Sequence, residues 1–111
     1  MKNLIEVFTN CYGPFGVRAA IEGCAKAGAG YIELAMIGHE MGGLKVPEET
    51  VIGEDTPPER IAEFKQALSH LGVRVISANG GDDLEAPEGV ERVRRRLQLA
   101  RDLGVRYFVM S

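Results

Sequence analysis

A repeated segment constrains the fold more than any other feature of this sequence. The segment His70–Ile76 (HLGVRVI) recurs 32 residues later as Asp102–Phe108 (DLGVRYF). In each copy, Leu-Gly closes a stretch of helical periodicity, and a short run rich in β-branched and aromatic residues follows, as in a buried strand. Glycine commonly follows a helix because it lacks the Cβ that penalises a positive φ angle. A looser copy covers residues 27–34. Three helix-to-strand joints predict βα units and a parallel sheet.

Composition limits the classes of protein that this chain can belong to. The 111 residues predict one domain, 1–111, with enough length for one core. A formal charge of −3 and an isoelectric point near 5.4 argue against a nucleic-acid binder or a binder of anionic membranes. No apolar run approaches the roughly 20 residues of a membrane span, and the strand pattern at the N-terminus leaves no room for a signal peptide. Cys11 and Cys24 lack a metal-type spacing and are interpreted as reduced thiols. We therefore expect a cytoplasmic protein.

The remaining pattern divides the chain into alternating strands and helices. Strands are predicted at residues 4–9, 31–37, 73–78 and 105–110, and helices at about 15–27, 57–71 and 87–103. Thr56 is predicted to cap the second helix, with Pro57 in its first position and Glu59 completing a capping box. Residues 38–55 have no clear period, and an insertion of this kind is usually a functional or mobile loop.

The third predicted helix combines an apolar stripe with an arginine-rich side. The stripe consists of Val90, Val93, Leu97, Ala100 and Leu103, and the other side carries Arg92, Arg94, Arg95, Arg96 and Arg101. The arginines could form a site for an anion or a nucleic acid. A solvated face is favoured, because the pairs Glu88–Arg92 and Glu91–Arg95 have the i,i+4 spacing of surface ion pairs.

The order β-α-β-α-β-α-β fits two folds. Four strands in the order 1-2-3-4 with all helices on one face make half of a TIM (β/α)8 barrel. A strand order that reverses gives a small doubly wound sheet with helices on both faces. The second strand favours the half barrel. Its alternation places Tyr31, Glu33 and Ala35 on one face, whereas a sheet covered on both faces needs nearly continuous apolar strands.

Glu33 therefore points into the expected barrel. An unpaired carboxylate there would be costly, so Glu33 is expected to have a partner, to bind a ligand or to lie near a solvated end of the barrel; Arg74 and Arg106 are the candidate partners. Glu33→Gln is then expected to destabilise the protein by about 1–3 kcal/mol.

The succession of these segments resembles a known family. The segments are Gly30–Leu34 (GYIEL), Leu71–Asn79 (LGVRVISAN) and Ala100–Val109 (ARDLGVRYFV), and in this order they are similar to the sugar phosphate isomerases and epimerases, which are xylose-isomerase-like TIM barrels. The similarity covers the chain from Leu4 to Ser111, the N-terminal half of such a barrel. In that family a divalent metal is held by Glu, Asp, His and Glu on later strands, at positions that would fall after Ser111. The resemblance therefore implies no metal ligand and no cofactor in this chain.

Polar residues after the predicted strands are the remaining candidates for a site, because barrel enzymes bind substrates at the carboxyl ends of their strands. The predicted substrate-binding residues are Asn10, Glu33, His39 and Asn79, whose side chains could hydrogen-bond the hydroxyl groups of a sugar or sugar phosphate. Thr9, Tyr12 and Ser111 occupy similar positions.

Three functions remain open at this point. The first is a half barrel that is inactive alone and closes by homodimerisation, because the first and fourth strands leave exposed sheet edges. The second is a non-enzymatic assembly module built from two copies. The third is an active isomerase or epimerase completed across the dimer, with Glu33, His39 and Asp82 or Asp83 from both chains.

Overall fold

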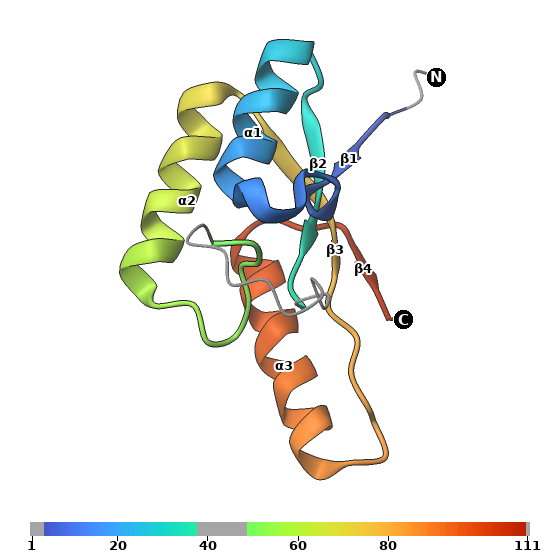
Figure 1. The fold of residues 1–111 in the computed structure, drawn as a ribbon. Coiled ribbons are helices and arrows are strands. Elements are labelled where there is room, and N and C mark those ends of the chain that lie inside the picture. The colour runs from blue at the N-terminus through green and yellow to red at the C-terminus, as the bar shows by residue number, and fades with distance from the viewer. Residues whose placement is uncertain (1–3, 38–48, 111) are drawn as a thin grey trace.

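The computed structural model describes residues 4–37 and 49–110, which form a four-stranded parallel sheet with three α-helices. The strands are β1 (Val7–Phe8), β2 (Tyr31–Ala35), β3 (Arg74–Asn79) and β4 (Tyr107–Val109), and they lie side by side in the order 1-2-3-4. The helices are α1 (Gly16–Ala27), α2 (Pro58–Leu71) and α3 (Pro87–Asp102), and a 3-10 segment, η1 (Thr9–Phe15), joins β1 to α1 (Figure 1).

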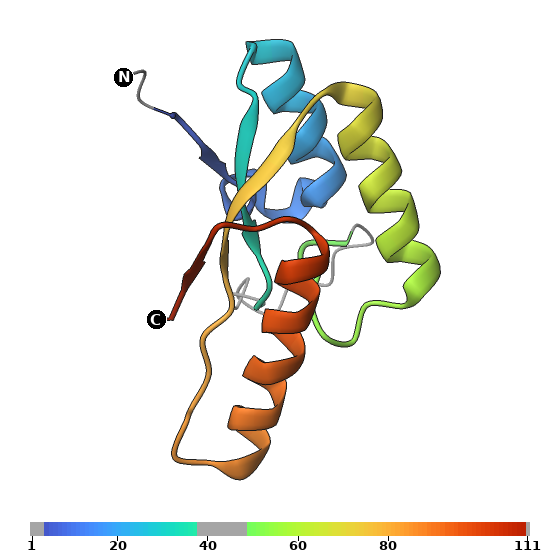
Figure 2. The same ribbon diagram turned by 180° about the vertical axis from the view of Figure 1, so that it is seen from behind.

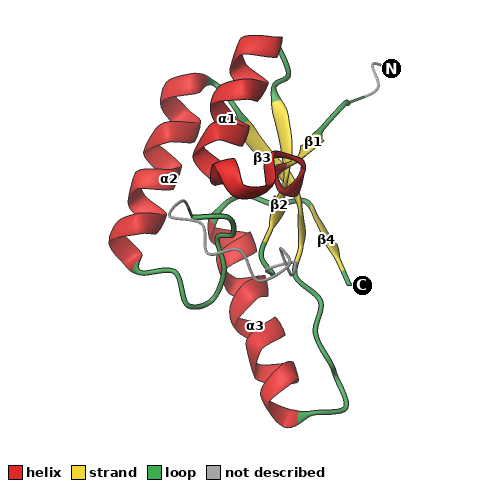
Figure 3. Ribbon diagram, viewed as in Figure 1, coloured by secondary structure: helices red, strands yellow, loops and turns green. Residues whose placement is uncertain are grey.

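All three α-helices lie on one side of the sheet, as the two opposite views show (Figures 1 and 2). Within the described residues the other side of the sheet carries no α-helix (Figure 3); we call it the open face. The predicted strand order and one-sided helices are confirmed, and the doubly wound alternative is excluded. This arrangement is that of half a (β/α)8 barrel.

The hydrophobic core fills the space between the helices and the sheet. On β2, Ile32 and Leu34 are fully buried there, and Met36 continues the same face beyond the strand, as the alternation predicted. The helices contribute Val17, Ile21, Cys24, Phe64, Leu68 and Ala100. None of the helices in the described part of the chain is both long and apolar enough to cross a membrane.

The three predicted joints between helix and strand are present. Gly28 and Gly72 follow α1 and α2 in the left-handed conformation, with φ angles of 76° and 68°. At the third joint Leu103 caps α3, and Gly104 takes the left-handed conformation with φ 76°. Each glycine lets the chain reverse without a Cβ clash.

The two outer strands are shorter than predicted. The first pairs only over Val7–Phe8, and the fourth only over Tyr107–Val109. After Phe8 the chain leaves the sheet because the Thr9 hydroxyl accepts a hydrogen bond from the Ala35 amide at 2.9 Å and η1 begins. An outer strand forms a ladder of hydrogen bonds with one neighbouring strand only, so its ends are held less firmly in the sheet than those of an inner strand.

The predicted capping box of the second helix is wrong. The N-cap is Pro57, and no side chain caps the helix. Thr56 instead uses its hydroxyl to accept a hydrogen bond from the Gly53 amide at 2.9 Å. The two consecutive prolines explain the shift, because Pro58 holds the preceding residue in an extended conformation, with ψ 148° at Pro57.

The predicted burial of α3 needs correction at three positions, two on the apolar stripe and one on the arginine-rich side. Val90 and Leu97 are exposed, and Arg96, expected in solvent, is 5% exposed. The amino-terminal part of α3 extends beyond the sheet (Figure 1), so nothing in the sheet covers Val90. The predicted ion pairs also differ, because Arg94 pairs with Glu91, whereas Arg92 and Arg95 reach acidic residues outside the helix.

Candidate functional site

Three polar side chains meet on the open face. Glu6 precedes β1, Glu33 lies on β2, and Ser77 lies on β3. The Ser77 hydroxyl is 3.0 Å and 2.9 Å from the two carboxylate oxygens of Glu6, to which it donates, and Ser77 is 4% exposed. Glu33 is half-buried and within hydrogen-bonding reach of both Ser77 and Glu6. We call Glu6, Glu33 and Ser77 the carboxyl cluster.

An irregularity in β3 places Ser77 in this cluster. Ile32 is opposite Val75, but Glu33 is opposite Ser77, so the register shifts by one residue at this point. The extra residue is Ile76; with regular pairing it would stand beside Glu33 in place of the serine. Bulges of this kind commonly redirect a side chain next to a functional site. The register continues across the sheet, so Phe8, Glu33, Ser77 and Tyr107 form one row.

The two carboxyl groups of the cluster differ in their surroundings. Burial raises the pKa of Glu33, the negative charge of Glu6 raises it further, and the hydrogen bond with Ser77 only partly offsets these effects. A half-buried carboxyl group with a raised pKa is suited to proton transfer, and carboxyl groups can also hydrogen-bond hydroxyl groups.

The predicted arginine partners of Glu33 are wrong. Its neighbours are Ser77 and Glu6, whereas the Arg106 guanidinium lies over the Tyr107 ring, 6.0 Å from the ring centre. Arg74 is exposed at the start of β3. Both arginines lie on the amino-terminal side of the row that contains Glu33, because Arg74 is opposite Tyr31 and Arg106 comes before Tyr107.

The structure places the other predicted site residues at different levels. Asn10 is half-buried in η1, just beyond β1. Asn79 ends β3, level with Ala35 and Val109, and its carbonyl accepts a hydrogen bond from the Met36 amide.

Thr9 is buried and bonded to β2, and Tyr12 packs against Gly23 of α1. His39 and Ser111 lie outside the described residues. Glu33 is the one predicted residue that belongs to the carboxyl cluster; Glu6 and Ser77 were not predicted.

A second polar group, which was not predicted from the sequence, holds the loops at the carboxyl edge of the sheet. The Arg96 guanidinium makes two hydrogen bonds to the Glu54 carboxylate, at 2.7 Å and 2.6 Å. It also donates to the carbonyls of Gly80 and Gly81 and lies 3.1 Å from Asp82. Arg96 could have been found from the sequence, since it shares the spacing of the buried residues Val93 and Ala100 on α3.

Charge pairing in this second group is nearly complete. Burial alone would raise the pKa of Glu54, but the hydrogen bonds from Arg96 outweigh it and hold the pKa below its usual value. Hydrogen bonds from Arg92 lower the pKa of Asp82. Asp83 is exposed and accepts a hydrogen bond from the Glu85 amide. Asp82 and Arg96 are thus engaged in joining loops, which argues against the role once considered for Asp82 in a shared active site.

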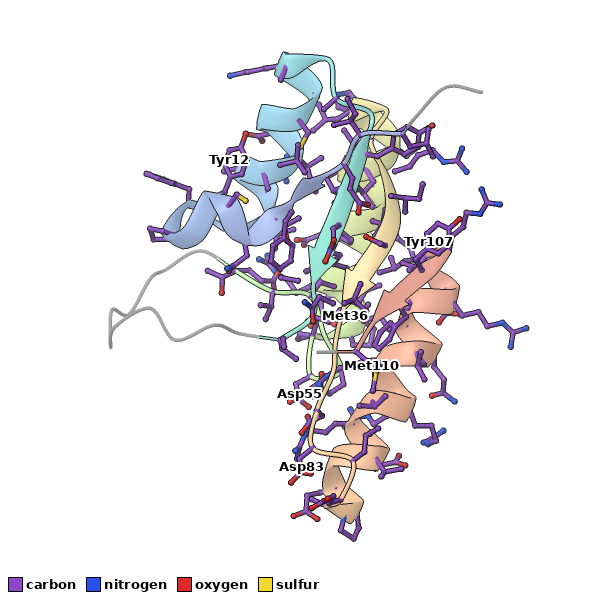
Figure 4. The ribbon with its side chains drawn as sticks, turned by 90° about the vertical axis from the view of Figure 1, so that its right-hand side faces the viewer. Tyr12, Met36, Asp55, Asp83, Tyr107 and Met110 are labelled. Carbon is purple, nitrogen blue, oxygen red and sulfur yellow. The ribbon has the colours of Figure 1, made fainter. Side chains whose placement is uncertain are left out.

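The carboxyl edge of the sheet is acidic and open. A hollow of about 650 Å³ lies there, lined by residues of segments 36–37, 49–51 and 53–57 together with Arg96. Asp55 and Asp83 both lie beyond the carboxyl ends of the strands in the view onto the open face (Figure 4). Among the described residues no group of three or more His, Cys, Asp or Glu is placed to hold a metal ion.

Comparison with known proteins gives a distant similarity to solved structures and no match by sequence. No family model matches the sequence, and no curated protein matches it. Among solved structures the chain is similar to a sugar phosphate isomerase/epimerase from Parabacteroides distasonis ATCC 8503, with a TM-score of 0.47 and 16% sequence identity. The match covers 95% of this chain and 40% of the other, so this chain spans less than half the length of that protein.

Proposed function

We propose that this chain forms one half of a barrel related to the sugar phosphate isomerases and epimerases, and that a second copy supplies the other half. The enclosed open face binds a small sugar, and the chain alone does not isomerise or epimerise it. The observation that carries the proposal is an open face with a polar centre and apolar edges.

The edges of the sheet expose large apolar side chains. Leu4 and Ile5 precede β1, and Tyr107, Val109 and Met110 lie on or just after β4; all of these residues are exposed. Figure 4 shows Tyr107 and Met110 at the β4 edge. Apolar groups gathered along unpaired strand edges are typical of a surface that another chain covers.

A second copy fits these edges by symmetry. All four strands are parallel, so a two-fold axis along the strands places β1 of each copy beside β4 of the other. The result is eight parallel strands with six helices outside, which is a closed (β/α)8 barrel that lacks two of its eight outer helices. Closure removes both edges at once.

The chemistry of the open face favours a neutral sugar over a sugar phosphate. The carboxyl cluster can donate to and accept from hydroxyl groups. The described carboxyl edge carries Glu49, Glu54, Asp55, Asp82 and Asp83. Arg96, which could have met a phosphate there, already donates to Glu54 and to two loop carbonyls. A phosphate dianion would therefore meet mostly negative charge.

The test of closure is the mass of the pure protein in solution. We expect a homodimer in sedimentation at micromolar concentration, weakened by Ile5→Lys at one edge and by Met110→Lys at the other, since charges block strand edges. Val90→Lys is the matched control, because Val90 is 50% exposed but lies on α3, away from both edges. A folded monomer of the unmodified chain would contradict closure by a second copy.

Phe108 is unsuitable for this test. Its ring packs against the core and approaches Gly80, so a charge there would disturb folding as well as association.

The test of inactivity is an assay of pure protein on ketoses and sugar phosphates with added Mg²⁺, Mn²⁺ or Co²⁺. No turnover is expected, because the resemblance assigns the metal ligands of the family to later strands. Turnover that a chelator abolishes would contradict this part of the proposal.

One observation favours the alternative of an enzyme completed across the dimer. The carboxyl cluster holds two acids close together and raises the pKa of Glu33, as is expected at a site of acid/base catalysis. Turnover without added metal, lost in Glu33→Gln and in the edge variant Ile5→Lys, would establish this alternative.

A further inference from the structure

The carboxyl cluster lies on the face that closure would enclose. Ser77 is already buried and hydrogen-bonded to Glu6, and Glu33 is half-buried between them in one copy alone. Any second half that covers the open face also removes water from these carboxyl groups.

Two-fold closure would bring both clusters into one layer. The axis runs along the strands, so Glu33 and its symmetry mate lie at the same height and point toward the same centre. The interior of an eight-stranded barrel is just wide enough for side chains to fill it. Four carboxyl groups, two from each copy, would then share one enclosed layer, and like charges held this closely cannot all stay ionised.

The surrounding charges do not neutralise this layer. The other titratable or charged groups on the strands around Glu33 are Tyr31 on β2, Glu6 before β1, Arg74 at the start of β3, and Arg106 and Tyr107 at β4. Arg74 is exposed, and Arg106 is held over the Tyr107 ring. Of these groups, Glu6 is the one that acts on Glu33.

We infer that closure of the barrel is coupled to proton uptake by Glu33, so that the homodimer is tighter at low pH and weakens as the pH rises. This inference rests on the proposed closure by a second copy and adds its regulation by pH.

The sign of the coupling follows from the environment of Glu33. Burial and the charge of Glu6 raise its pKa in one copy, and both effects increase when a second copy encloses the cluster. A group whose pKa rises on assembly takes up a proton as the complex forms. The stabilisation is fully present below the pKa of the open half and is lost as the pH rises through the pKa of the closed barrel.

The experiment is sedimentation of the protein across a pH series, with the dissociation constant as readout. As the pH rises above the ordinary range of a glutamate, the dissociation constant is expected to rise by up to about tenfold per pH unit for each proton taken up, until the pH exceeds the pKa of Glu33 in the closed barrel. Glu33→Gln mimics the protonated acid, so its dimer should be tight at both ends of the series. Glu6→Gln removes the other negative charge of the cluster, so the dissociation constant of this variant should also depend less on pH than that of the unmodified protein.

Glu59→Gln is the control for a general effect of charge. Glu59 is exposed in the first turn of α2, away from the sheet, and its variant should keep the full pH dependence. A dimer of the unmodified protein with the same dissociation constant throughout the series would overturn the inference and leave closure intact. Monomers at every pH, in Glu33→Gln as well, would overturn both.

Discussion

Arg96 shows how much a single residue can organise at the carboxyl edge. It comes from α3, yet it joins Glu54, which precedes α2, to the carbonyls after β3. The side chains of Arg96 and Glu54 are 7% and 8% exposed. A buried ion pair of this kind contributes little net stability compared with apolar residues, but removal of one partner leaves a charge without compensation.

Arg96→Met is therefore expected to lower the free energy of unfolding by about 3–5 kcal/mol, the range for breaking a buried pair. Urea unfolding measures the change. Arg94→Met is the matched control, because Arg94 pairs with Glu91 on the exposed side of the same helix, and little change is expected. An equal loss in both variants would show that helix propensity, not the buried pair, is responsible.

Glu33→Gln tests the carboxyl cluster within one copy, and the expected effect is opposite to the loss predicted from the sequence. The pKa of Glu33 is raised, mainly by burial and by Glu6. Stability associated with its proton is present at low pH and is lost as the pH rises through the folded-state pKa. Above that pKa, the glutamine variant should be more stable than the parent, and the difference should vanish in acid. Urea unfolding of the dilute monomer at both pH values measures this; a loss at high pH would restore the original prediction.

At the scale of elements, periodicity and glycine placement predicted the architecture well, and the ends of the elements less well. Each αL glycine and each strand centre lies where the repeat put it, because these features depend on local backbone chemistry. The length of β1, the cap of α2 and the burial of Arg96 depend on partners distant in the chain. The carboxyl cluster also depends on distant partners. The register shift at Ile76 aligns Ser77 with Glu33, and no residue pattern in the sequence of β3 predicts this shift.

Gly89 gives a prediction at this scale. In the interior of an exposed helix, a change from glycine to alanine usually stabilises by about 0.5–1 kcal/mol. Here an added Cβ would overlap the backbone carbonyl of Asp83, in the turn that Arg92 and Arg96 fix through Asp82. Gly89→Ala should therefore destabilise the protein by about 1–3 kcal/mol, the range for overpacking. Val90→Ala, at the exposed neighbouring position, should change stability much less. A gain in the melting temperature for Gly89→Ala would show that the turn can move.

For the whole molecule, the question is how the open face is covered. Two copies can close into one barrel around an axis along the strands, or they can stack their open faces with the strands in opposite directions. Both arrangements bury the apolar edges at least in part, and both give a dimer in sedimentation. They differ in where they put the carboxyl ends of the strands. Closure puts the carboxyl ends of the two copies on the same side of the dimer, and stacking puts them on opposite sides.

A spin label on Cys11 distinguishes the two arrangements. Cys11 is exposed in η1, at the carboxyl end of β1, whereas Cys24 is buried and burial raises the pKa of its thiol, so reagents should modify Cys11 first. Eight strands spaced as in ordinary sheets make a barrel roughly 15 Å across. The two labels of a closed barrel should thus lie on the order of 20–30 Å apart. In the stacked arrangement the strands of the two copies run in opposite directions, so the two labels lie on opposite sides of the dimer's midplane, and a longer separation is expected. A pulsed dipolar distance in the shorter range, lost in Ile5→Lys, is the expected result; a single long distance would replace the barrel with a stacked pair of sheets.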